Sequence, residues 1–207
     1  MPKLVLIKHS LPDVRPEQPP SRWRLSPEGS RRALELAEAL RPMGLERIFS
    51  SREAKAVQTA AFAGERLGLG FEVREGLHEH DREREPFASP EDFEVKVREL
   101  FRRPSERVFR SESAQEALAR FSSAIDAVIS EASGADIAVV AHGTVISLFV
   151  ASKCGVDGFE LWQRLGLPSY VVLETPGWRL VEVVEEVAAH EKPRAAEDAI
   201  ASEDVTP

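Results

Sequence analysis

Two short apolar runs of this sequence each lead to a histidine, and this pattern constrains the fold more than any other feature. Leu4–Ile7 is followed by Lys8 and His9, and Ile137–Ala141 is followed by His142. Apolar, β-branched runs of this length are typical of strands that are buried on both faces of a parallel sheet. Because ligands bind beyond the carboxyl ends of such strands, we expect both histidines to lie at a functional site.

Strand-like and helical segments alternate along the 207 residues, and 43% of the residues are hydrophobic, which suffices for one large core. We therefore predict an α/β fold, a single domain with a mostly parallel central sheet and helices on both faces. The expected strands are Lys3–Ile7, Arg47–Ser50, Phe71–Val73, the run that ends at His142, Tyr170–Glu174 and Arg179–Glu185. The expected helices begin near Pro27, Glu53, Pro90, Ser113 and Gly143, whereas the segment with Gly155 and Gly158 reads as a loop.

The domain is expected to span residues 1–188, with 83–110 forming a helical insertion that caps the pocket. A loop at 11–24 carries four prolines and should be stiff. These two regions are expected to determine which leaving groups the site accepts. Residues 189–207 are polar, rich in alanine and acidic, which predicts a disordered tail.

Composition excludes several classes of protein. With 27 Lys and Arg against 35 Asp and Glu, the formal net charge is −8, which argues against a nucleic-acid partner. Cys154 is the only cysteine, so no intramolecular disulfide and no thiolate metal cluster is expected, in keeping with a reducing compartment. The amino terminus has no signal-peptide pattern and no apolar run has membrane-spanning length, which predicts a cytoplasmic protein with no membrane partner.

Several common chemistries lack their sequence signatures. There is no glycine-rich loop that ends in Lys-Ser or Lys-Thr and no Gly-x-Ser-x-Gly motif. Cys154 has no arginine close by in sequence, which disfavours a thiol phosphatase. The segment 78–81 holds two histidines but no evident third and fourth ligand, so no metal site is expected. The chemistry that remains as a candidate is catalysis by histidine without a cofactor.

Five motifs occur in order between Lys3 and Glu185. They are Lys8-His9-Ser10, Leu25-Ser26-Pro27-Glu28-Gly29, the segment from Ser50-Ser51 through Lys55-Ala56 to Gln58-Thr59-Ala60, Leu77-His78-Glu79, and Ala141-His142-Gly143. This series resembles the histidine phosphatase superfamily, also called phosphoglycerate mutase-like. Its members carry Arg-His-Gly, Leu-Thr-x-x-Gly, Ser-Ser-x-x-x-Arg-Ala-x-Gln-Thr-Ala, Leu-x-Glu and Ser-His-Gly in this order. The resemblance implies the three-layer sandwich of that family.

Roles for individual residues follow from this resemblance. It implies that His9 is the nucleophile that takes the phosphoryl group as a phosphohistidine, which water then attacks. Glu79 would protonate the leaving oxygen and then activate water, a role that suits a carboxyl group with a raised pKa. His142 would donate to the transferring phosphoryl group, and Gly143 would lie beside it. The resemblance implies no metal ion.

The sequence departs from the family at the positions that hold phosphate. Both arginines that clamp phosphate align with lysines, Lys8 and Lys55, which keep the charge and lose the planar fork that binds two oxygens. Ser10 stands in place of glycine, where it would either crowd the phosphate or donate a hydrogen bond. Arg52 and Arg82 are candidates for auxiliary phosphate contacts.

We predict a metal-independent phosphomonoester hydrolase that acts through a phosphohistidine on a small phosphorylated metabolite. A mutase is less favoured, because it needs tight capture of a small sugar-acid phosphate and the clamp is weakened. The alternative is a catalytically silent protein on the same fold that binds a phosphorylated ligand or inorganic phosphate. A third reading is a non-phosphate enzyme in which Lys8 or Lys55 serves as a base of lowered pKa. A homodimer is left open.

Overall fold

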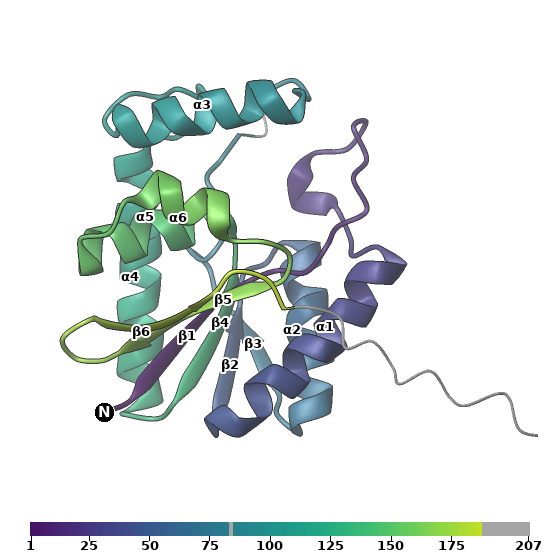
Figure 1. Cartoon of the computed structure of the whole chain (residues 1–207), viewed down its shortest axis with the longest axis vertical. Coiled ribbons are helices and arrows are strands. Elements are labelled where there is room, and N and C mark those ends of the chain that lie inside the picture. Colours follow the sequence, from purple (N-terminus) through teal and green to yellow (C-terminus); the bar gives the residue numbers. More distant parts are fainter. Residues whose placement is uncertain (83–84, 188–207) are drawn as a thin grey trace, which may run out of the picture.

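The computed structural model describes residues 1–82 and 85–187 and shows one α/β domain built on a six-stranded sheet (Figure 1). The strands are β1 (Lys3–Lys8), β2 (Arg47–Ser50), β3 (Phe71–Val73), β4 (Ile137–Ala141), β5 (Ser169–Glu174) and β6 (Arg179–Val184), in the spatial order β3-β2-β4-β1-β5-β6. The first four of these in space are parallel, and β5 runs antiparallel to both β1 and β6. The predicted mostly parallel sheet is confirmed.

Helices cover both faces of this sheet and make the fold three layers deep (Figure 1). One face carries α1 (Pro27–Leu40) and α2 (Ala54–Leu67), and the other carries α4 (Ala114–Ala132) and α5 (Gly143–Cys154). The remaining helices are α3 (Pro90–Arg102), α6 (Gly158–Arg164) and the short 3-10 turns η1 (Pro20–Arg22) and η2 (Arg41–Met43). None of the helices in the described ranges is both long enough and apolar enough to cross a bilayer.

The alternation of side chains along β1 explains why this run is apolar throughout. Leu4 and Leu6 pack into the core under α4 and α5, whereas Val5 and Ile7 pack into the core under α1 and α2. All four side chains are buried. Since successive residues of a strand point to opposite faces, a strand covered by helices on both sides must be apolar at every position.

The predicted helix starts are present with their capping contacts. Ser26 accepts a hydrogen bond from the Gly29 N–H ahead of α1, and Ser113 forms a capping box with Glu116 ahead of α4. The expected loop around Gly158 is wrong, because α6 begins there with Asp157 as its N-cap. Gly158 marks a close approach to α3 rather than a loop, since a Cβ atom would lie 2.7 Å from the Phe101 ring.

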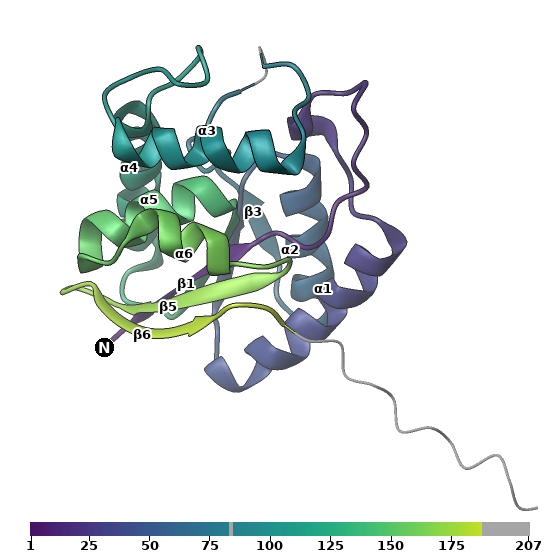
Figure 2. The ribbon, with the colours of Figure 1, turned by 45° about the horizontal axis from the view of Figure 1, so that its top comes forward.

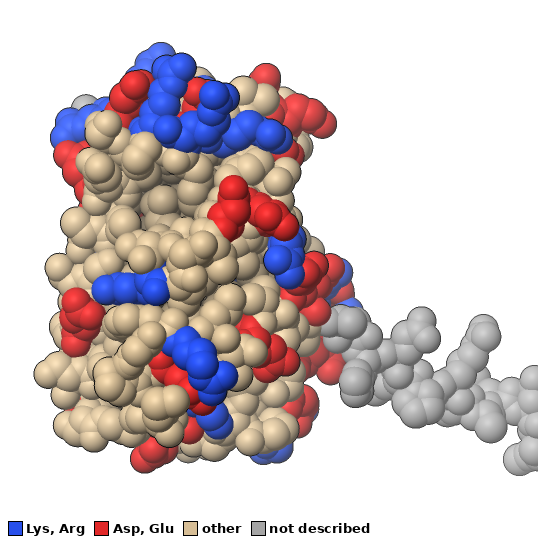
Figure 3. Space-filling model, turned by 60° about the vertical axis from the view of Figure 1, so that its left-hand side comes forward, with Lys and Arg blue, Asp and Glu red and all other residues tan. Residues whose placement is uncertain are grey.

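The insertion places α3 beyond the carboxyl ends of the strands, at the top of the molecule in Figure 1, and Figure 2 shows it next to α6. Phe93 of α3 meets Trp162 of α6 with ring centroids 5.9 Å apart. On the face shown in Figure 3, lysine and arginine side chains gather at the end where α3 lies. Arg98 pairs with Glu94, and Arg102 and the C-cap residue Arg103 both pair with Glu99, so part of that charge is compensated. The predicted tail at 189–207 lies outside the described residues.

The chain that follows His9 is held against the start of α1. The Leu11 carbonyl accepts hydrogen bonds from the Ser26 N–H at 3.0 Å and from the Ser26 hydroxyl at 3.2 Å. A Cβ atom on Gly29 would lie only 1.9 Å from the same carbonyl oxygen. Gly29 therefore serves close packing between α1 and the segment that leaves His9.

Replacing Gly29 with alanine is expected to destabilise the protein by about 1–3 kcal/mol, because backbone must move to make room for the methyl group. Helix propensity alone gives the opposite sign, since alanine is favoured over glycine inside a helix by about 1 kcal/mol. Urea unfolding of Gly29→Ala measures the difference. Gly70→Ala is the matched control, because no heavy atom lies within 4 Å of a Cβ built there. A Gly29→Ala protein as stable as Gly70→Ala would refute the packing argument.

Candidate active site

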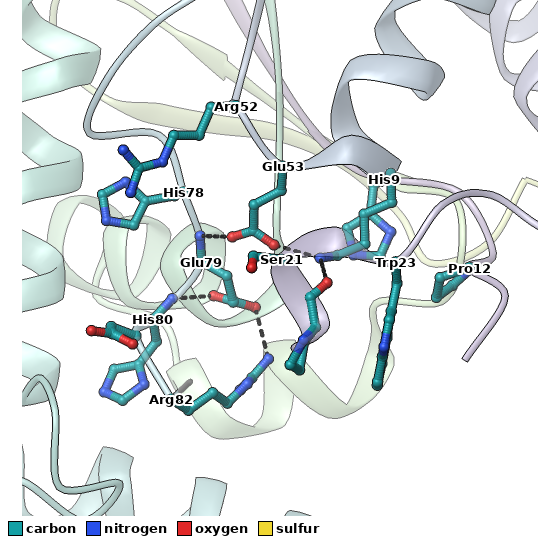
Figure 4. Close-up of a pocket in the computed structure, with 13 residues that line it drawn as sticks. His9, Pro12, Ser21, Trp23, Arg52, Glu53, His78, Glu79, His80 and Arg82 are labelled. Carbon is teal, nitrogen blue, oxygen red and sulfur yellow. Dashed lines mark hydrogen bonds and ion pairs between the residues drawn. The ribbon is translucent and has the colours of Figure 1, made fainter. Parts of the chain in front are cut away.

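A pocket of about 400 Å³ opens at the carboxyl ends of β1 and β2. Residues from three segments line it, namely 9–23, 52–55 and 78–82 (Figure 4). They belong to the loop after β1, the start of α2 and the loop after β3. The site thus lies where an open parallel sheet is expected to bind its ligand.

His9 lies at this pocket and is held in one tautomer. Its Nδ1 donates to the Ser10 carbonyl oxygen at 2.8 Å, and because a carbonyl oxygen only accepts, the proton must be on Nδ1. Nε2 therefore carries a lone pair. Burial and the nearby charge of Lys55 hold the pKa of His9 well below its ordinary value, so the ring is neutral at pH 7. A neutral imidazole with a free lone pair is a nucleophile.

His142 lies next to His9 and beneath the pocket surface. The two ring centroids are 5.2 Å apart, and His142 is fully buried. Its Nε2 lies 2.8 Å from the Ser51 hydroxyl oxygen and 3.5 Å from the Glu53 carboxylate. Burial, followed by the charge of Lys55, keeps the pKa of His142 well below its ordinary value. The structure therefore brings the two predicted histidines together, with only His9 facing the pocket.

Glu79 lies in the pocket wall with its carboxylate at the start of α5 (Figure 4). Its two oxygens accept hydrogen bonds from the Thr144 and Val145 N–H groups, each at 3.2 Å, and one of them also accepts from the His80 N–H at 2.9 Å. Free N–H groups and the helix dipole favour negative charge at a helix N-terminus. The local backbone therefore stabilises the ionised form of this side chain.

Glu79 does not have the raised pKa that suits a general acid. Burial alone would raise it, but the Arg82 guanidinium, His142 and the His80 N–H together bring the pKa below its ordinary value. Arg82 Nη2 lies 3.5 Å from the Glu79 carboxylate (Figure 4). In the unliganded site Glu79 is thus a carboxylate that can accept a proton.

A second carboxylate in the pocket, Glu53, was missed by sequence reasoning. It pairs with Lys55, and the two residues are only 7% and 5% exposed. Glu53 Oε1 also accepts a hydrogen bond from the Glu79 N–H at 2.8 Å (Figure 4). The family motif leaves this position unspecified, and residues two apart do not face each other inside a helix. The pair forms because Glu53 is the N-cap of α2 and has an extended backbone.

Lys8, one of the predicted phosphate ligands, does not line the pocket. Its Nζ donates to the Leu165 carbonyl oxygen at 2.5 Å, and a Cβ atom on Gly143 would lie 3.1 Å from its Cε. Burial lowers the pKa of Lys8 to about 8, against the opposing effect of Glu79. The alternation of β1 puts Lys8 on the face of α5 and α6, so neither Lys8 nor Gly143 lines the pocket.

Ser10 also forms its hydrogen bonds outside the pocket. Its hydroxyl donates to the Gly29 carbonyl oxygen at 2.7 Å, and its N–H donates to Thr59 Oγ1 at 3.0 Å. The side chain is fully buried and does not line the pocket. The structure therefore gives Ser10 a role in fastening the segment after β1 and does not bring it to the position predicted for a phosphate ligand.

Both candidate auxiliary arginines do line the pocket. Arg82 stacks on Phe93 of α3, with its guanidinium carbon 4.6 Å from the ring centroid, and so links the site to the insertion. The Arg52 side chain is 57% exposed at the mouth and pairs with Glu75 at 2.9 Å. Their contact with phosphate stays a prediction.

The neighbouring histidine, His80, packs within the fold. It is 1% exposed, its Nε2 donates to the Glu112 carbonyl oxygen at 2.8 Å, and its ring packs on Phe109. Across residues 1–82 and 85–187, no group of three or more His, Cys, Asp or Glu side chains is arranged to hold a metal ion. The pocket chemistry thus rests on His9, Glu79, Glu53 and the cations around them.

Several solved structures that are similar to this chain are named as phosphatases. The mycobacterial glucosyl-3-phosphoglycerate phosphatase in complex with inorganic phosphate matches with a TM-score of 0.73 and 21% identity, over 90% of this chain and 99% of that chain. A mutant phosphoserine phosphatase from Entamoeba histolytica in complex with phosphoserine gives 0.73 and 18%, over 89% and 97%. The alpha-ribazole phosphatase from Shigella flexneri gives 0.71 and 17%, over 92% and 100%. At these identities the likeness shows a shared fold.

Comparison with curated protein sequences gives no match. The family model of the histidine phosphatase superfamily (branch 1), in contrast, matches residues 4–187, which is nearly the whole described chain. This match agrees with the order of the five motifs and with the two histidines that meet at the ends of β1 and β4. The chain therefore belongs to the histidine phosphatase superfamily.

Proposed function

We propose that this protein is a metal-independent phosphatase that hydrolyses a small phosphomonoester through a phosphohistidine on His9. The observation that carries the proposal is the state of His9. Its proton is fixed on Nδ1 by the Ser10 carbonyl, and its neutral ring leaves an Nε2 lone pair in a pocket that also holds the Lys55 ammonium. Family membership and the phosphatase names of similar structures support the same reaction.

The reaction divides into two displacements at phosphorus. In the first, Nε2 of His9 forms a bond to phosphorus while the bond from phosphorus to the ester oxygen breaks, and the departing oxygen takes up a proton. In the second, water forms a bond to phosphorus, the P–N bond breaks, and His9 regains its lone pair. Two displacements with an intermediate have lower barriers than one difficult displacement.

We assign to Glu79 the transfer of the proton in both displacements. It is a carboxylate in the unliganded site, so it takes a proton from water in the second displacement. For the first displacement it must hold a proton beside the ester oxygen. A phosphoryl group in the pocket adds negative charge next to Glu79 and raises its pKa, which favours that protonated form.

The pocket volume and the insertion favour a small substrate. The loop at 11–24 reaches the pocket through Trp23, and the insertion contacts the pocket residue Arg82 through Phe93. We infer that residues 83–110 act as a cap that meets the leaving group. The similar structures are named for glucosyl-3-phosphoglycerate, phosphoserine and alpha-ribazole phosphatases, which is consistent with a phosphorylated metabolite.

A second candidate function is a silent protein that binds a phosphorylated ligand. The observation in its favour is that Lys55, which lines the pocket, is already paired with Glu53, while Lys8 is bound to Leu165. In that case inorganic phosphate binds and no ester is hydrolysed. The test of the proposed function separates the two.

The parent protein is expected to release inorganic phosphate from members of a panel of phosphomonoesters in the presence of a chelator, and His9→Ala is expected to release none. Acid quenching destroys a phosphoramidate whereas base preserves it, so a base-stable, acid-labile phosphoprotein identifies the intermediate. Circular dichroism and unfolding midpoints control for the fold of the variant. Equal turnover by both proteins would overturn the nucleophilic role of His9. Silence in both, with phosphate binding retained, would favour the second candidate.

Glu79→Gln is expected to slow the hydrolysis of an alkyl phosphate by about 100-fold or more, because an alkoxide leaves only when protonated. An activated aryl phosphate, whose leaving group needs no proton, should be slowed far less in the first displacement. Burst kinetics with both substrates separate that step from hydrolysis of the intermediate. Glu75→Gln, the same change at the mouth of the site, is the control. Equal slowing of the first step with both substrates would refute a general-acid role.

A further inference from the structure

A buried carboxylate lies among the groups that would hold a transferring phosphoryl group. Glu53 Oε2 pairs with the Lys55 ammonium, and Glu53 Oε1 accepts from the Glu79 N–H and lies 3.5 Å from His142 Nε2. After burial itself, the positive charge of Lys55 is the largest influence that lowers the pKa of His9. Glu53 therefore occupies the donors that a phosphoryl oxygen at His9 would use.

The groups that surround Glu53 come from four segments, and most of them carry no positive charge. Lys55 lies on α2, His9 follows β1, His142 precedes α5, and Glu79 comes from the loop after β3. Both histidines are neutral, since burial holds the pKa of each well below its ordinary value. Burial would raise the pKa of Glu53, but Lys55 and the Glu79 N–H bring it below its ordinary value. The ionised carboxylate of Glu53 thus offsets the positive charge of Lys55.

We propose that Glu53 determines the charge of the anion that this site accepts, and that it selects a singly charged phosphoryl group over a doubly charged one. The inference rests on the proposed function to the extent that the phosphoryl group is placed at His9. Repulsion between two charges grows in proportion to each of them, so a dianion meets about twice the penalty of a monoanion at the same position. The low exposure of Glu53 limits screening by salt.

A singly charged phosphomonoester also supplies the proton that the first displacement needs. Its phosphoryl group carries one O–H, and the Glu79 carboxylate next to it can take this proton and deliver it to the ester oxygen as the bond to phosphorus breaks. The products are then the free alcohol and a dianionic phosphoryl group on Nε2 of His9. No other proton donor is needed, which agrees with a Glu79 that is ionised before substrate arrives.

The test uses two tetrahedral oxyanions whose charge is fixed near pH 7, sulfate as the dianion and perrhenate as the monoanion. Calorimetry of the full chain measures the affinity of each probe for the parent and for Glu53→Gln, which keeps an oxygen for the Glu79 N–H. Perrhenate is expected to bind about tenfold more tightly to the variant and sulfate about a hundredfold, because the electrostatic change scales with probe charge. Comparing each probe with itself removes the difference in size between them.

Three further proteins make the result decisive. Glu65→Gln removes the same charge about 18 Å further along α2, at 1.5 Å per residue, and should change both affinities by less than about twofold. Glu53→Met repeats the test if the amide variant is unstable. The gain in anion affinity should disappear in the double variant Glu53→Gln/Lys55→Gln. In Glu53→Gln alone, this gain comes from the Lys55 ammonium, which Glu53 no longer neutralises.

Equal gains for sulfate and perrhenate, or no gain for either, would overturn the selection by charge. These outcomes are independent of turnover. Charge-dependent gains in a protein that hydrolyses no ester would leave the inference standing and refute the proposed phosphatase. Turnover that needs His9, with equal gains for both probes, would support the phosphatase and refute the role of Glu53.

Discussion

The parallel pairing of β1 with β4 is the contact on which the site depends. The two strands run side by side with Lys8 opposite Ala141, and the His9 N–H extends the ladder by donating to the Ala141 carbonyl at 3.1 Å. Because both strands end at the same level, the residues that follow them, His9 and His142, lie with ring centroids 5.2 Å apart. Hydrogen bonds along the strands and two-sided burial make this arrangement rigid.

Around this pair the fold buries several charges that must compensate one another. Glu53 is matched by Lys55, and Glu79 is matched by Arg82 together with the first N–H groups of α5. Removing one partner of a buried ion pair leaves an uncompensated charge and costs about 3–5 kcal/mol. A ligand that displaces such a partner must replace its charge. An anion that binds in the pocket must therefore either displace one of these carboxylates or cause it to take up a proton.

The pairing of buried charges also bears on the lysine that stands at position 55, where the family motif has arginine. A planar guanidinium binds two oxygens of one anion, whereas an ammonium acts as a point charge that several acceptors can share. Lys55 is shared in this way between Glu53 and the Pro20 carbonyl oxygen, which its Nζ contacts at 2.8 Å. Arg82 adds a further positive charge to the pocket wall and packs on Phe93 of α3. The insertion is thus in direct contact with a residue of the pocket wall.

Local patterns in the sequence determined the strands, most of the helices and the two histidines at strand ends. Buried strands are recognisable from period and composition, and caps such as Ser26 and Ser113 act through residues three positions away. The family motifs also located His9, Glu79 and Lys55 at one pocket. Helix α6 escaped prediction because Gly158 is read locally as a breaker, although it packs against Phe101 from another part of the chain.

Tertiary structure alone decided the charge relations of the site. Whether Lys8 faces the pocket or Leu165 depends on which helix layer covers its side of β1. The lowered pKa of Glu79 depends on Arg82, three residues away, and also on His142 and the start of α5, which are more than 60 residues away in sequence. Electrostatic interactions act through space and strengthen with burial, so a linear motif specifies which residues are present but not which of them share a charge.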